Sequence, residues 1–291
     1  MANGHPEKSG EGRRASAERE IEAGQRFEFG RNWSAYLEGL DEARIVEAER
    51  SMTTMLGRCD LSGARFLDLG CGSGLFSLAA RRLGARVHSV DFDPRSVACA
   101  AELRRRYHPD DGGWTIGQGS VLDADYLSSL GRFDIVYSWG VLHHTGDMWR
   151  AIDQVAKRVR AGGTLYISIY NDQGRRSRLW TAVKRTYNRR PMSRPLLLGG
   201  ALLLLWGPIT VRDAMRGRPF RSWRRYGQTR GMSAWRDLVD WVGGYPFAVA
   251  KPEAVFDFCR ERGFSLVKLK TCAGGHGCNE FVFTNAAPPD S

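Results

Sequence analysis

Blocks of hydrophobic and polar residues predict strands and helices in alternation through the middle of the chain. Short runs rich in Val, Ile, Leu and aromatic residues predict five strands, at residues 65–69, 86–91, 114–118, 133–138 and 164–170. Apolar residues at helical spacing predict helices at residues 73–83, 94–107 and 148–159, the last ended by Gly162 and Gly163. Repeated strand–helix units favour an α/β fold with a parallel, doubly wound sheet, in which ligands bind at the carboxyl ends of the strands.

Weaker patterns flank this core. Asp41 is placed to cap a helix whose apolar residues include Ile45 and Met52. Residues 252–262 predict a helix, and two further strands, at residues 264–271 and 280–284, predict a closing antiparallel hairpin. The chain therefore divides into a polar tail expected to be disordered (1–25), an N-terminal helical segment (26–60), the α/β core (61–172), an insertion (173–247) and a C-terminal helix and hairpin that complete the core (248–291).

Charge changes the interpretation of only one of these parts. The chain carries 43 Lys and Arg against 32 Asp and Glu, a net charge of +11. Residues 175–230 hold 15 of the basic residues and a single acidic one, Asp213, so this segment carries +14 and the remainder −3. The core therefore has no basic surface that demands nucleic acid, and the question of an anionic partner concerns the insertion.

The insertion contains an uncharged, leucine-rich run at residues 195–211, with arginines on both sides. Three interpretations remain open. The run forms a helical lid over a substrate pocket, an interfacial segment whose leucines enter lipid while its arginines meet anionic headgroups, or a membrane span, for which 17 residues interrupted by glycines and Pro208 are short. Arginines mixed with aromatic residues also fit RNA binding, although no RNA-binding module accompanies them.

Cysteine usage bears on compartment and metal binding. The six cysteines lack the spacing of a disulfide framework, and residues 1–25 contain no apolar leader, so we expect a reducing, cytoplasmic environment. Cys272, His276 and Cys278 surround the predicted hairpin turn. Because a structural zinc ion takes four closely paired ligands, we predict no bound metal.

Candidate chemistry gathers at the carboxyl ends of the predicted strands. The first strand runs into DLGCGSG at residues 68–74, where glycines allow a sharp turn and close approach of the backbone to a ligand. Its GxGxG spacing departs from the GxGxxG fingerprint of dinucleotide-binding proteins. Asp91 ends the second strand, where a carboxylate can accept hydrogen bonds from both hydroxyls of a ribose, and Phe92 can cover an adenine.

These motifs carry a family resemblance. The combination DLGCGSG, VDFDP, GSVLD, FDIVYSWGVLHHT and AGGTLYISIY resembles class I S-adenosylmethionine-dependent methyltransferases, and the closing hairpin fits the seven-stranded, Rossmann-like sheet of that family. The resemblance implies S-adenosylmethionine as cofactor. By position it implies a set of cofactor-binding residues: Asp68, Gly70, Cys71, Gly72 and Gly74 in the first loop, Asp91 at the ribose, Phe92, Ser120 and Val121 at the adenine, and Ser138 and Trp139 over the same pocket.

Two adjacent histidines are the candidate catalytic bases. Methyl transfer is an in-line displacement, in which a protein aligns the nucleophile and, where needed, removes a proton. His143 and His144 follow the fourth strand at the methyl end of the cofactor site. Quinone-biosynthesis O-methyltransferases, which this segment resembles, often carry E-x-L-E-H here, whereas this chain has Gly140 and His143 at the two Glu positions and keeps His144. In phosphoethanolamine methyltransferases a histidine at the position of His143 assists the reaction.

We therefore expect a cytoplasmic S-adenosylmethionine-dependent methyltransferase of a small molecule, with oxygen favoured as the acceptor. The expected substrate is hydrophobic or anionic, such as a lipid-linked phenol or a natural product, and contact of residues 175–230 with an anionic membrane surface stays open. Two alternatives remain: a methyltransferase of tRNA or another RNA, and a non-catalytic scaffold that binds S-adenosylmethionine.

Overall fold

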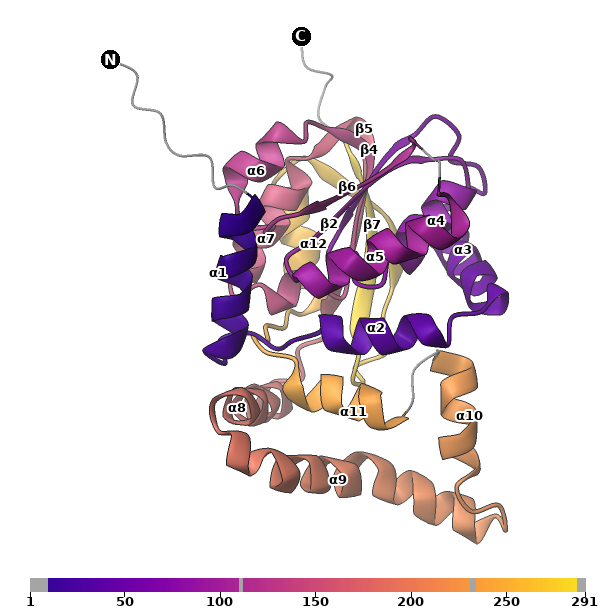
Figure 1. The fold of residues 1–291 in the computed structure, drawn as a ribbon, viewed down its shortest axis with the longest axis vertical. Helices are drawn as coiled ribbons and strands as arrows, with labels where there is room; N and C mark the ends of the chain where they lie inside the picture. The colour runs from indigo at the N-terminus through magenta and orange to yellow at the C-terminus, as the bar shows by residue number, and fades with distance from the viewer. Residues whose placement is uncertain (1–9, 110–111, 231–233, 287–291) are drawn as a thin grey trace.

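A seven-stranded sheet forms the centre of the molecule (Figure 1). The structure is a computed structural model that describes residues 10–109, 112–230 and 234–286. The strands lie in the order β3-β2-β1-β4-β5-β7-β6. Their bounds are β1 Arg65–Leu69, β2 Arg86–Asp91, β3 Trp114–Gln118, β4 Phe133–Trp139, β5 Val159–Tyr170, β6 Phe264–Lys270 and β7 Cys278–Asn285. Strands β1 to β5 pair in parallel and β7 runs antiparallel to β5 and β6, which confirms the predicted sheet.

Helices cover both faces of this sheet. One face carries α3 (Glu42–Leu56), α4 (Leu75–Arg82) and α5 (Pro94–Tyr107), and the other carries α6 (Ala124–Ser129), α7 (Met148–Ala156) and α12 (Pro252–Arg260). Because successive strand residues point to opposite faces, Phe66 joins one hydrophobic core and Leu67 the other. Burial on both faces explains why the strands appear in the sequence as nearly continuous apolar runs.

The insertion is helical, as predicted, and forms a separate layer below the sheet in Figure 1. It consists of α8 (Arg175–Arg189), the short η2 (Pro191–Ser193), α9 (Arg194–Met215), α10 (Arg221–Arg230) and α11 (Ala234–Gly243). Helix α9 lies furthest from the sheet, and α2 (Gly30–Glu38) runs between the sheet and the insertion. A small core that includes Trp180, Trp206 and Leu238 holds the layer together.

The prediction of a disordered tail over residues 1–25 is wrong for most of its length. Gly10–Glu22 form helix α1, whereas residues 1–9 lie outside the described residues. Ala17 is fully buried, and Glu20 forms an ion pair with Arg26 at 2.6 Å. This ion pair and packing beside β3 therefore stabilise a polar helix that has no apolar stripe in its sequence.

The glycine pair at residues 162 and 163 also has a different role from the one predicted. Helix α7 ends at Ala156, and β5 already begins at Val159, so both glycines lie within the strand. The pairing of β4 with β5 shifts register in this region, between Phe133 and Ile135, and Gly162 has φ +67°. The glycines thus accompany an irregularity in the strand rather than a helix end.

A buried polar network links the first three strands to α4. The hydroxyl of Ser77 donates to Asp68 Oδ2 at 2.5 Å and lies 2.6 Å from the hydroxyl of Ser89. Trp114 Nε1 donates to Ser89 Oγ at 2.8 Å. Since the Ser77 proton is directed to Asp68, Ser89 donates to Ser77 and accepts from Trp114. Every polar group in this buried chain is therefore satisfied.

Replacing Ser89 with alanine should destabilise the fold by about 1–3 kcal/mol, because the Trp114 N–H loses its acceptor in the core and Ser77 Oγ loses its donor. Urea unfolding followed by tryptophan fluorescence measures this. The matched control, Ser265→Ala at an exposed position of β6, should change stability by less than about 0.5 kcal/mol. Equal effects of the two substitutions would contradict the role assigned to the network.

Candidate functional site

The turn between β1 and α4 requires glycine for conformation and for space. Gly70, Gly72 and Gly74 have φ of +82°, +54° and +83°, in the left-handed region. A Cβ on Gly70 would lie 2.3 Å from Val141 Cγ2, and one on Gly72 would lie 2.9 Å from Trp33 Cε2. The loop is therefore closely packed between the segment after β4 and helix α2, at the point where the strand order reverses between β1 and β4.

Three of the predicted cofactor residues lie beneath this loop rather than on its surface. Asp68 is 2% exposed and accepts from Ser77, and its burial raises the pKa of its carboxyl to about 7. Ser138 is fully buried and donates to the Leu69 carbonyl at 2.8 Å. Cys71 is also buried, which raises the pKa of its thiol well above the usual range. These side chains support the loop from inside the sheet.

Asp91 connects the loop to the end of β2. Its Oδ2 accepts from the Gly72 N–H at 2.9 Å, and its Oδ1 accepts from the Asp93 N–H at 2.9 Å. Burial raises the pKa of this carboxyl to about 6. The Phe92 N–H also acts on this carboxylate, and since a carboxylate has about four acceptor sites, Asp91 can still accept from a ribose hydroxyl.

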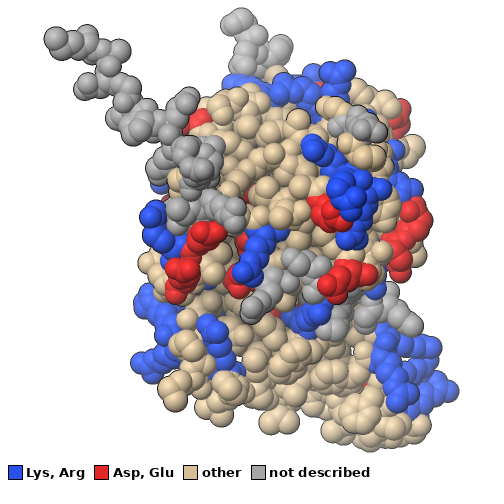
Figure 2. All heavy atoms as spheres, in the orientation of Figure 1, with Lys and Arg blue, Asp and Glu red and all other residues tan. Residues whose placement is uncertain are grey.

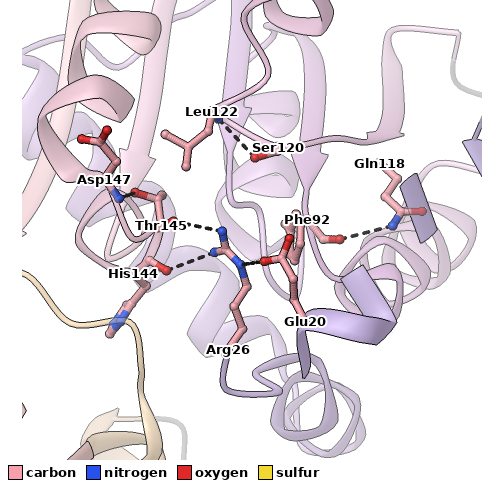
Figure 3. Close-up of polar contacts among 9 residues, drawn as sticks. All are labelled: Glu20, Arg26, Phe92, Gln118, Ser120, Leu122, His144, Thr145 and Asp147. Carbon is pink, nitrogen blue, oxygen red and sulfur yellow. Dashed lines mark hydrogen bonds and ion pairs between the residues drawn. The ribbon is translucent and has the colours of Figure 1, made fainter. Parts of the chain in front are cut away.

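The remaining predicted cofactor residues lie at the ends of neighbouring strands. Figure 3 shows Phe92 and Ser120 in the segments that follow β2 and β3. The Ser120 hydroxyl accepts from the Leu122 N–H at 3.2 Å, and Val121 packs into the core. Trp139, at the end of β4, is 41% exposed. The sequence motifs are thus brought to one edge of the sheet.

The segment from Arg26 to the end of α2 covers this edge, which the sequence patterns did not predict. We call this segment the N-terminal cover. The Arg26 guanidinium lies 4.4 Å above the Phe92 ring and donates to the carbonyls of His144 and Thr145 at 3.2 and 2.9 Å (Figure 3). Arg26 therefore bridges the predicted adenine end and the histidine end of the site. In the sequence, this part of the chain shows a mixture of aromatic and polar residues at positions 27–40. Such a mixture does not indicate which distant residues the segment contacts.

A second contact fixes the same cover. Asp93, at the start of α5, accepts from the Gly30 N–H at 2.8 Å with one carboxylate oxygen and from the Arg95 N–H at 2.8 Å with the other. It caps α5 and holds the beginning of α2 at the same time. Helix α2 then places Trp33 against Gly72.

His143 is completely buried in the turn after β4. Its ring centroid lies 4.5 Å from that of His144 and 4.2 Å from that of Tyr170. Within the described residues, neither ring nitrogen meets full hydrogen-bond geometry with a partner, although the backbone of Ser168 lies near enough to act on the ring. Burial, together with neighbouring His144 and Lys184, lowers the pKa of His143 well below its usual value. A buried imidazole without well-formed hydrogen bonds is costly, which is typical of a functional position.

His144 has a defined orientation. Its Nδ1 lies 2.6 Å from the Pro246 carbonyl oxygen. Because a carbonyl only accepts, Nδ1 carries the proton and Nε2 carries the lone pair. Burial, with Lys184 adding to the effect, lowers the pKa of His144 to about 3, so the ring is neutral at physiological pH. Its ring contacts Phe29 and Tyr170, with centroids 5.1 and 5.7 Å away.

The insertion contributes a buried lysine that sequence analysis also missed. Lys184, on α8, is 1% exposed and donates to the Trp241 carbonyl on α11. Its Nζ lies 4.4 Å from the centre of the Trp241 ring and 4.6 Å from that of Phe247. Burial lowers the pKa of Lys184 to about 7, partly opposed by Asp240, whose own pKa burial raises to about 7. The lysine thus places a cationic group beside both histidines.

The cysteine–histidine group at the hairpin turn makes ordinary structural contacts. Cys272 Sγ lies 3.3 Å from the Gly275 carbonyl, and His276 packs against the rings of Trp180 and Trp241. Among the residues that the structure describes, no group of three or more His, Cys, Asp and Glu side chains is arranged to hold a metal ion.

Comparison with known proteins matches this geometry to one family. A family model described as "Methyltransferase domain" matches residues 40–227, which span the core and most of the insertion. Ubiquinone biosynthesis O-methyltransferases from Cereibacter sphaeroides and Xanthomonas oryzae pv. oryzae are 28% identical over 178 residues and 35% identical over 181 residues. These matches cover 61% and 58% of this chain but 62% and 63% of the relatives, so the chain spans less than two thirds of their length.

Solved structures resemble the chain more distantly. A magnesium protoporphyrin IX methyltransferase from Synechocystis with bound S-adenosylhomocysteine is 14% identical over 83% of each chain, with a TM-score of 0.49.

Buried His143 and partly buried His144 should make the fold acid-sensitive. Both have lowered pKa values in the folded state, whereas histidines of the unfolded chain titrate near about 6.5. As pH falls below about 6.5 the unfolded chain gains protons that the folded chain does not, so the free energy of unfolding should fall. His143→Phe should flatten this dependence in urea unfolding between pH 7 and 5. A parent-like slope in His143→Phe would contradict the assignment.

Proposed function

The chain belongs to the methyltransferase-domain family, and on that premise we propose that it transfers a methyl group from S-adenosylmethionine to an oxygen atom of a small molecule. The observation that carries the proposal is the junction of the glycine loop with Asp91, in a loop whose Gly70 packs against Val141, two residues before His143. The names of the two curated relatives support oxygen as the acceptor.

The residues at this edge fit S-adenosylmethionine. The backbone at Gly70 and Gly72 leaves no space for side chains, and Asp91 keeps an acceptor site for a ribose hydroxyl. Phe92, with Ser120 and Val121 nearby, would hold the adenine. The cofactor, when bound, supplies a methyl group activated by a positively charged sulfur.

His144 is the better candidate for proton removal. The Pro246 carbonyl holds its Nδ1 proton, which leaves Nε2 as the acceptor. A lowered pKa makes this nitrogen a weak base. A weak base suffices, because the hydroxyl of an acceptor becomes strongly acidic as its oxygen gains the methyl group. His143 would pack beside the acceptor and hold the ring of His144 in place.

The walls of the site favour an aromatic or anionic acceptor. Tyr170 and Phe247 pack against the histidines, and Trp241 packs against both of these rings, with centroids 5.3–6.2 Å apart among the three. The ammonium of Lys184 would stabilise a phenolate or carboxylate oxygen. We propose a phenol or a comparable acidic hydroxyl compound as the substrate, and the cytoplasm as the compartment.

The RNA alternative gains little support from the insertion. Stacking on bases requires accessible aromatic faces, and Trp180, Tyr187 and Trp206 are each 7% exposed and pack within the insertion. Phe220 and Trp235 are 53 and 49% exposed, so part of the aromatic content of the insertion is accessible. The scaffold alternative differs from the proposal only in turnover, so an activity measurement separates them.

Asp91→Ala should weaken binding of S-adenosylmethionine by about 100-fold, because it removes two charged hydrogen-bond acceptors and releases the Gly72 N–H. Calorimetric titration measures the affinity. Asp257→Ala, on the exposed surface of α12, is the matched control and should bind as the parent does. Unchanged affinity of Asp91→Ala would remove the carboxylate from the cofactor site.

His144→Ala should lower the turnover rate by about 100-fold or more and change cofactor affinity little, because it removes the proposed proton acceptor. The assay uses methyl-labelled S-adenosylmethionine and follows label into lipid, polar and RNA fractions of a cell extract. Label in the lipid or polar fraction supports the proposal. Label in RNA supports the alternative, label in no fraction supports a scaffold, and full activity of His144→Ala places the base elsewhere.

A further inference from the structure

The outward face of α9 is apolar along nearly its whole length. Leu196, Leu203, Leu204 and Val211 are 79, 74, 64 and 59% exposed, and their spacing of seven and eight residues places them on one side of the helix. Glycines and prolines fill the rest of that side between residues 195 and 211, which contain no charged residue. A helix of 22 residues presents this face over about 33 Å.

The opposite face of α9 is bound to the protein. Ala201 and Trp206 are 5 and 7% exposed, and the Trp206 ring lies 4.2 Å from that of Trp223 on α10. Thr210, the polar residue of the run, accepts from Trp223 Nε1 at 2.9 Å. Pro191–Met215 is long and apolar enough to cross a membrane, and only 11% of its most apolar 18 residues is buried inside the protein. Because its inner face packs on α8, α10 and α11, the helix is suited to lie along a bilayer surface rather than to cross it.

Arginines stand at both ends of this apolar face. In Figure 2 the lower edge of the molecule, where α9 lies, is tan with blue atoms at each end. Around the carboxyl end of α9, five arginines line a hollow of about 330 Å³: Arg212, Arg216, Arg218, Arg221 and Arg225. Repulsion from Arg225 and Arg218 lowers the pKa of Arg221, as expected where like charges gather.

A buried acid shapes this hollow. Asp213 is 5% exposed and accepts from the N–H and the hydroxyl of Ser222 at 2.7 and 3.0 Å. These bonds fold α10 back against α9 and set the arginines of both helices around one space. The hydrogen bond from the Ser222 backbone N–H is the main cause that lowers the pKa of Asp213. The acid therefore stays charged within the turn.

We propose that α9 and its flanking arginines dock the protein on the surface of an anionic phospholipid bilayer. The exposed leucines enter the boundary of the acyl chains, and the arginine-lined hollow takes a lipid phosphate. Charge complementarity and an apolar face occur together here, which is the pattern of interfacial helices. Nucleic acid offers phosphate but no apolar partner for the leucines. This docking is independent of the proposed methyl transfer.

Vesicle sedimentation with the full chain tests the proposal. The protein should sediment with vesicles of phosphatidylcholine plus phosphatidylglycerol and remain in solution with phosphatidylcholine alone.

Leu203→Glu should reduce the bound fraction about tenfold or more, because one leucine side chain no longer enters the apolar layer. The matched control, Val267→Glu, alters a valine that is 64% exposed on β6 and should bind as the parent does. Arg218→Gln with Arg221→Gln should reduce binding about tenfold, and Arg86→Gln with Lys268→Gln, which removes equal charge from the core, should not.

Three outcomes would overturn the proposal. The intact chain does not sediment with anionic vesicles, or Leu203→Glu and Val267→Glu behave alike. Alternatively, gel filtration shows that Leu203→Glu converts a dimer into a monomer while no variant binds vesicles, in which case the face joins two copies of the chain. S-adenosylmethionine affinity, measured in parallel, should be unchanged in every variant and confirms that each is folded.

Discussion

A short chain of hydrogen bonds between backbone amides and two carboxylates holds the candidate site together. Gly72 donates to Asp91, Asp91 accepts from Asp93, and the Asp93 side chain accepts from Gly30. The chain connects the loop after β1, the end of β2, the start of α5 and the N-terminal cover. Each donor is a main-chain N–H, so the positions of all four segments depend on backbone geometry as much as on side-chain identity. The Phe92 ring and the Arg26 that lies over it owe their places to this arrangement.

Much of the core was predictable because its signals are local. Short, nearly continuous apolar runs identified the strands. Asp41 was correctly identified as the cap of α3, where it accepts from the Arg44 N–H. The parallel pairing of β1 with β2 then brings the glycine loop and Asp91 together, as the carboxyl ends of parallel strands require. Pattern analysis therefore located the parts of the site that lie on regular strands.

The parts that escaped prediction depend on contacts between distant segments. Helix α1 is polar and is stabilised by its neighbours, so its sequence looks like that of a disordered tail. Lys184 is one of 15 basic residues between positions 175 and 230, and only the packing of α8 against α11 distinguishes it from the exposed ones. The glycines of β5 resemble a helix end because a strand irregularity and a helix terminus favour the same residue. None of these outcomes follows from propensity or periodicity.

The ammonium of Lys184 has a consequence for how the site responds to motion. Lys184 belongs to α8, yet its Nζ donates to the Trp241 carbonyl and lies over the Trp241 ring, both on α11. Asp240, also on α11, acts on it electrostatically. Separation of the two helices would admit water and return its pKa toward the ordinary value for lysine, so the amine would gain a proton. The electric field at the histidines is therefore coupled to helix packing.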